Sequence, residues 1–139
     1  MGGYVLARPR TVSSERPRAL VVDDDEPIRN MLSHVVERQG FDVETARDGV
    51  EAIERLDHDR YDVVLLDLMM PRVDGYGVLA WMRRMDPRML KCTIVATAVP
   101  ENEVARALFD NVYRVHQKPF NMTQLVADVR ACSGSQSLS

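Results

Sequence analysis

Three aspartates stand directly after short apolar runs, in positions where they could act together on a metal ion or a phosphate. The run 19–22 (ALVV) is followed by Asp23 and Asp24, and the run 63–66 (VVLL) is followed by Asp67. Carboxylates that converge repel one another unless a cation compensates their charge. Hard oxygen ligands in this number, without histidine or thiolate, favour Mg²⁺ over Zn²⁺. The sequence therefore predicts a magnesium site built from these three acids.

A hydroxyl and an ammonium group follow the later apolar runs in the same way. Thr97 comes after the run 93–96 (TIVA), and Lys118 comes shortly after the segment 112–116. The lysine is a compact cation suited to pairing with a phosphoryl group. Three carboxylates against one Mg²⁺ and the Lys118 ammonium have a total charge of zero, which favours the same interpretation.

The elements that would position these groups are predicted by hydrophobic periodicity. Continuous apolar runs of four residues are typical of parallel strands that are buried on both faces. Strands that alternate with amphipathic helices predict an α/β fold with a doubly wound, five-stranded parallel sheet and helices on both faces. In such sheets the ligand site lies at the carboxyl ends of the strands, where all five groups would meet. The expected strands are 19–22, 43–46, 63–66, 93–96 and 112–116, and the expected helices run from Pro27 to Gly40, onward from Asp48, and over 78–85, 101–109 and 122–131.

Some polar residues at these positions are expected to serve structure alone. Asp25 is placed to cap the helix that Pro27 opens, and Asp48, with Glu51 three residues on, to cap the next helix. Asn121 with Gln124 form a capping pair for the last helix. The three histidines are scattered singly, so we expect surface or packing positions for them. Cys92 and Cys132 lie forty positions apart without a CxxC pairing, which argues against a zinc site or a disulfide framework.

Length and composition set the remaining bounds. The chain has 139 residues and a net charge of −3, which predicts one domain and argues against coating of nucleic acid or an anionic membrane. No apolar run approaches the roughly 20 residues of a membrane span, and the first residues lack a secretory h-region, so a cytoplasmic location is expected. We expect flexible tails over 1–18 and 133–139, around a single domain over 19–132.

Four segments in order resemble the motif set of bacterial response regulator receiver domains. They are LVVDDDEPIR, VVLLDLMMPRVDGYG, IVATA and QKPF, and the match extends over residues 19–132. The resemblance implies a flavodoxin-like receiver fold and a two-component phosphorelay switch. It makes Asp67 the acceptor of a phosphoryl group from a sensor histidine kinase, in a Mg²⁺-dependent step. The chain would then be a phosphoacceptor with self-catalysed phosphotransfer rather than an enzyme.

The resemblance also implies a role for each remaining site residue. Asp23 and Asp24 become metal-binding acids, and the Met69 backbone carbonyl becomes a further Mg²⁺ ligand. Thr97 becomes the switch hydroxyl, and Lys118 the lysine that pairs with the phosphoryl group. The peptide bond before the proline that follows this lysine is usually cis in the family.

Two departures from the family pattern affect the switch and its timing. Receiver domains usually place Tyr or Phe three residues before the lysine, where this chain has Val115. Tyr113, two residues earlier, is expected on the same strand face, where it either replaces that ring or simply packs. Met69 and Val99 occupy positions that often carry polar groups able to orient water, so we expect slow loss of the phosphoryl group.

The expected partners are a sensor histidine kinase or phosphotransfer protein, and an output partner or an output domain of a longer protein. The surface formed by residues 101–131 is the expected partner face, and it could also form a dimer through the helix 101–109, the strand 112–116 and the helix 122–131. We expect no direct nucleic-acid binding and no membrane contact.

Three other functions compete with this interpretation. A phosphatase of the haloacid dehalogenase class would need a second acid at Met69, and a nucleotide-binding module would need a glycine-rich loop. A scaffold that relays signals without phosphorylation remains the stronger rival because of Val115.

Overall fold

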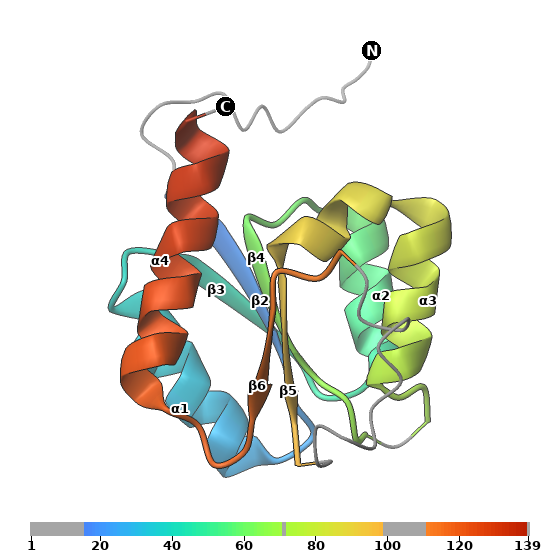
Figure 1. Ribbon diagram of the computed structural model, residues 1–139. Helices are drawn as coiled ribbons and strands as arrows, with labels where there is room; N and C mark the ends of the chain where they lie inside the picture. Colours follow the sequence, from blue (N-terminus) through green and yellow to red (C-terminus); the bar gives the residue numbers. More distant parts are fainter. Residues whose placement is uncertain (1–15, 71, 99–110, 139) are drawn as a thin grey trace.

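A parallel sheet forms the centre of the molecule (Figure 1). The computed structural model describes residues 16–70, 72–98 and 111–138, with the side chains of the last helix described as far as Cys132. Within this part of the chain five strands pair in the order β3-β2-β4-β5-β6, and every pairing is parallel. The predicted fold class is confirmed. The strands are β2 (Arg18–Val22), β3 (Asp42–Ala46), β4 (Val63–Asp67), β5 (Thr93–Thr97) and β6 (Arg114–Gln117).

Helices cover both faces of this sheet. Figure 1 shows α1 and α4 on one face and α2 and α3, side by side, on the other. The strand order reverses at β2, because β3 lies on one side of it and β4 on the other, and ligands bind open α/β sheets at such a switch point. The predicted helix over 101–109 lies outside the described residues. The helices are α1 (Glu26–Glu37), α2 (Gly49–His58), α3 (Gly75–Met85), the 3₁₀ helix η1 (Pro87–Cys92) and α4 (Met122–Leu138).

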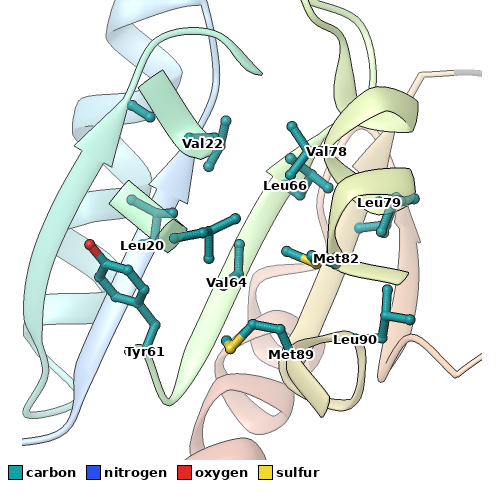
Figure 2. Close-up of a cluster of buried hydrophobic side chains, with 14 of the residues drawn as sticks. Leu20, Val22, Tyr61, Val64, Leu66, Val78, Leu79, Met82, Met89 and Leu90 are labelled. Atoms are coloured by element: carbon teal, nitrogen blue, oxygen red, sulfur yellow. The ribbon is translucent and has the colours of Figure 1, made fainter. Parts of the chain in front are cut away.

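The apolar strand runs separate the core into two layers. Leu20 and Val22 of β2 point toward α2 and α3, whereas Ala19 and Val21 point toward α1 and α4. Figure 2 shows the first of these layers, in which strand side chains meet those of α3 and η1. Burying one such aliphatic side chain contributes about 1.5–3 kcal/mol. Because both faces are covered, the central strands β2, β4 and β5 are buried along almost their whole length, as the apolar runs predicted, whereas the edge strands β3 and β6 carry exposed polar residues. Both cysteines are free and buried in these layers.

Side-chain caps start the helices close to the carboxyl end of the sheet. Asp25 accepts a hydrogen bond from the Ile28 amide, and Asp48 accepts one from the Glu51 amide at 2.9 Å. Asn121 caps α4 through the Gln124 amide at 3.0 Å. These three predicted caps are confirmed. A cap satisfies one of the amides that a helix start leaves unpaired, so each helix starts at a defined residue beside the site.

The ends of the domain differ from the expected tails. The Pro17 carbonyl accepts a hydrogen bond from the Asp42 amide at 2.8 Å, and Arg18 belongs to β2, so ordered structure begins before residue 19. At the other end α4 continues to Leu138, where a flexible tail from 133 was predicted. Extending an existing helix adds one hydrogen bond for each residue ordered, which outweighs the weak helix propensity of Gly134 and its neighbouring serines. Residues 1–15 lie outside the description, and none of the described helices combines the length and apolarity of a membrane span.

Candidate functional site

Three carboxylates meet where β2 and β4 end. The register pairs Val22 with Leu66, which brings the next residues, Asp23 and Asp67, side by side. Oxygens of Asp23, Asp24 and Asp67 all lie within 4.8 Å of one another. Asp23 and Asp67 are 1 % and 4 % exposed, whereas Asp24 faces solvent. The structure thus gathers all three predicted metal-binding acids, two of them buried.

Lys118 reaches this cluster from the loop after β6. Its Nζ lies 3.4 Å from Asp23 Oδ2 and 3.3 Å from Asp67 Oδ1, so one ammonium bridges both buried carboxylates. Its backbone amide donates to the Thr97 carbonyl at 2.8 Å, and the Lys118–Pro119 peptide bond is cis, as the resemblance implied. The lysine is therefore held at its backbone by β5 and at its tip by the acids.

The electrostatics of the cluster show an excess of negative charge. Burial, followed by the neighbouring Asp23 charge, raises the pKa of Asp67 to about 6, although Lys118 and the Met69 amide both lower it. Burial likewise raises the pKa of Asp23, against the Asp25 amide and Lys118. For Lys118 burial lowers the pKa, but Asp23 and Asp67 outweigh it and the net shift is upward. Three carboxylates against one ammonium leave two negative charges. This donor set fits a divalent cation that prefers oxygen ligands.

Met69 and Thr97 lie beside the acidic cluster. The Met69 amide donates to Asp67 Oδ1 at 3.3 Å, and the preceding Leu68 amide donates to the Ala96 carbonyl at 3.1 Å. Ala96 pairs with Asp67 in the sheet, and the buried Thr97 is the next residue along β5. Met69 therefore contacts the Asp67 side chain through its own amide, and Thr97 directly follows the residue that pairs with Asp67 in the sheet. Val99 lies outside the described residues.

Tyr113 does not share a strand face with Val115, so that prediction is wrong. Val115 packs against the core layer of α2 and α3, whereas Tyr113 packs with Phe120 against the layer of α1 and α4. The reason is that β6 begins only at Arg114, so the alternation of a strand does not extend to Tyr113. Of its two expected roles, packing is the one that the structure supports.

A buried polar pair between β6 and α4 escaped the sequence reasoning. His116, expected at a surface or packing position, is buried and its Nε2 lies 2.6 Å from Asp128 Oδ2. Arg114 Nε lies 3.3 Å from the same oxygen. The signal available in the sequence was an aspartate between the apolar positions Leu125 and Val129 of a helix face. In the structure this residue, Asp128, is 2 % exposed. Nothing in the spacing identified His116 as its partner.

Comparison with known families matches this fold and site to one family. The model of the response regulator receiver domain matches residues 19–130, most of the chain. This chain belongs to the response regulator receiver domain family. It is therefore a receiver domain of the kind that acts in two-component signalling, as its four motifs indicated.

Curated relatives of this receiver domain are longer proteins. The transcriptional regulatory protein PrrA of Mycobacterium bovis is 39 % identical over 117 residues, which cover 83 % of this chain and 49 % of PrrA. The response regulator MprA of Mycobacterium ulcerans is 38 % identical over 114 residues, which cover 82 % of this chain and 49 % of MprA. The chain thus spans about half the length of these relatives.

Solved receiver domains share the architecture. The receiver domain of the Francisella response regulator 1452 is 28 % identical, with a TM-score of 0.78, over 86 % of this chain and 98 % of that one. The response regulator TrrA of Thermotoga maritima was solved in complex with Mg²⁺-BeF. It is 28 % identical with a TM-score of 0.74, over 84 % of this chain and 98 % of TrrA.

Proposed function

We propose that this receiver domain accepts a phosphoryl group on Asp67 from a sensor histidine kinase or a phosphotransfer protein, in a Mg²⁺-dependent step. The observation that carries this proposal is the acidic cluster at the switch point, where Lys118 contacts both buried carboxylates. Phosphorylation would change the conformation of the domain and so control an output partner or an output domain.

The metal would be held by the oxygens of Asp23, Asp24 and Asp67, with the Met69 carbonyl as a further ligand. When bound, Mg²⁺ offsets the negative charge that gathers during phosphoryl transfer. The two surplus negative charges of the cluster support this assignment, because a divalent cation neutralises them. The solved TrrA complex with Mg²⁺-BeF shows that a protein of the same fold binds such an ion.

The side chains of this domain account for the transfer itself. An oxygen of ionised Asp67 attacks the phosphorus of a phosphohistidine, the P–N bond breaks, and the imidazole leaves with that electron pair. With a pKa of about 6, Asp67 is about nine-tenths ionised at pH 7. Lys118, which is released from its contact with the Asp67 carboxylate, pairs with an oxygen of the phosphoryl group.

The switch follows from the change in charge. The acyl phosphate replaces one negative charge on Asp67 by about two on the phosphoryl group. The surplus charge attracts hydrogen-bond donors, and the Thr97 hydroxyl at the end of β5 is the nearest candidate along the strand. Movement of Thr97 would shift the segment that follows β5. This shift would change the surface that the domain presents to a partner. Receiver domains usually have an aromatic ring at the position of Val115, and in this chain no ring at that position can follow the movement of Thr97.

Slow loss of the phosphoryl group is part of this proposal. The Met69 side chain, 57 % exposed beside Asp67, has no group that accepts a proton from water, and Val99 has none either. Hydrolysis as fast as in receivers with polar residues at these two positions would refute this part.

The partners follow from the same chemistry and from the relatives. A sensor kinase as donor implies a cytoplasmic location, and the half of PrrA that this chain does not match suggests an output domain in a longer protein. The surface over residues 101–131 would bind the output partner or a second copy of the chain, because these residues follow Thr97 closely in the sequence.

The direct test uses a small acyl phosphate as donor. The full chain is incubated with this donor with and without Mg²⁺, and the intact mass is measured. We expect a gain of one phosphoryl group that requires Mg²⁺, and Asp67→Asn should abolish it. Absence of any gain in a folded protein would favour the scaffold reading, and a gain that persists in Asp67→Asn would move the acceptor elsewhere.

A further inference from the structure

The segment 68–74, of which residues 68–70 and 72–74 are described, follows the phosphoacceptor and is joined to β5 and to the start of α3 through the backbone of Leu68. The Leu68 amide donates to Ala96 at 3.1 Å, and the Leu68 carbonyl accepts from the Gly75 amide at 3.0 Å. Between these points the Met69 side chain is 57 % exposed, so its own packing does little to place its carbonyl. Apart from the hydrogen bond of the Met69 amide to Asp67, the position of that carbonyl therefore depends on contacts made by its neighbours in the segment.

An ion pair connects this segment to the turn between β3 and α2. Arg72 Nε donates to Asp48 Oδ2 at 2.9 Å, and Nη2 donates to the same oxygen. The other carboxylate oxygen of Asp48 caps α2 by accepting from the Glu51 amide. The Asp48 side chain is 8 % exposed and that of Arg72 is 57 % exposed, so a buried, capping carboxylate holds an exposed guanidinium.

The backbone around this ion pair is also constrained. Arg72 has a φ of 63°, in the left-handed region where a residue other than glycine is strained. The next residue, Val73, accepts a hydrogen bond from the Gly49 amide at 2.8 Å. A Cβ on Gly49 would lie 2.0 Å from that carbonyl oxygen, so the two turns approach too closely for any other residue. The sequence thus keeps a strained arginine where glycine would be relaxed, which indicates that its side chain contributes.

We propose that the Arg72–Asp48 ion pair positions the segment 68–74 for metal binding and phosphoryl transfer at Asp67. Arg72 and Asp48 are positioning residues in this scheme, which rests on the function proposed above. Without the pair, the segment would have to be ordered at the moment the metal binds, and that ordering would reduce the affinity. Groups that orient metal ligands typically contribute 10- to 100-fold in affinity. Because Arg72 acts through the backbone, we expect a smaller effect of about three- to tenfold.

The test measures Mg²⁺ affinity by titration calorimetry on the full chain, well below its melting temperature. Arg72→Ala removes the guanidinium, and Asp48→Asn removes the charge while keeping the helix cap. Each variant should raise the Kd for Mg²⁺ about three- to tenfold. The Kd of the double variant should not exceed that of the single variant with the higher Kd. Arg72→Lys should restore part of the affinity. The rate of phosphorylation by a small acyl phosphate should fall at limiting Mg²⁺ and recover at saturating Mg²⁺.

Arg47→Ala is the matched control. Arg47 lies next to Asp48 on the same turn and pairs with Glu51 at 2.9 Å, but the described contacts do not connect it to the segment 68–74. Its variant should keep the wild-type Kd. An unchanged Kd in Arg72→Ala and Asp48→Asn would overturn the inference, as would an equal change in Arg47→Ala. If the wild type itself neither bound Mg²⁺ nor gained mass, the proposed function would fail instead.

Discussion

Replacing Asp67 by asparagine should stabilise the metal-free domain at neutral pH, although it removes the proposed phosphoacceptor. The pKa of Asp67 is about 6, against 3.8 for a free aspartate side chain, because burial and Asp23 disfavour its charge. A difference of about two pKa units corresponds to about 3 kcal/mol. Water at the carboxyl end of the sheet screens part of this interaction, so we expect about 2 kcal/mol to be observed.

The sign of this effect depends on pH. The folded state binds the Asp67 proton more tightly than the unfolded state, so the stability of the wild type falls as pH rises from about 4 to about 6. At pH 7.5 the wild type carries the full penalty of the ionised carboxylate, and asparagine carries none. At pH 4 both side chains are essentially neutral in the folded state, and most of the difference should disappear.

Thermal and urea unfolding followed by circular dichroism provides the assay, in a chelating buffer at pH 7.5 and at pH 4. We expect Asp67→Asn to raise the melting temperature at pH 7.5 by about 8 °C, at about 4 °C per kcal/mol for a domain of this size. Mg²⁺ should narrow the gap by stabilising the wild type. Asp57→Asn, an exposed carboxylate on α2, is the control and should change stability by less than about 0.5 kcal/mol. Equal or lower stability of Asp67→Asn at pH 7.5 would refute the reasoning.

Three further outcomes are expected from the structure. The Kd for Mg²⁺, measured by calorimetry, should rise about tenfold between pH 7 and pH 5, because protonated Asp67 does not bind a cation; an affinity independent of pH would contradict this. Gly49→Ala should destabilise the domain by about 3 kcal/mol or more in urea unfolding, because its Cβ meets a backbone oxygen, whereas Gly40→Ala, with a φ of 98° and open space, should cost only about 1 kcal/mol. Asp128→Asn should destabilise by about 2 to 4 kcal/mol, since it leaves His116 without its charged partner, and an unchanged unfolding midpoint would show that the pair contributes nothing.

The sequence alone determined the features that depend on neighbouring residues. The apolar runs 19–22 and 63–66 predicted buried strands, because each face of a covered parallel sheet must be apolar. The caps at Asp25, Asp48 and Asn121 could be predicted because a cap joins residues three apart. The gathering of the acids was also predictable, since parallel strands all end on the same side of a sheet.

Only the tertiary structure decided which distant side chains touch. Arg72 and Asp48 are 24 residues apart, and no local pattern relates them. His116 and Asp128 meet because α4 packs on β6, and Tyr113 lies in the opposite core layer because the strand begins at Arg114, two residues later than expected. Hydrophobic periodicity and helix caps relate residues that are only a few positions apart in the sequence. Contacts between elements depend on strand order and on where each strand starts, and a shift of one residue moves a side chain to the other face.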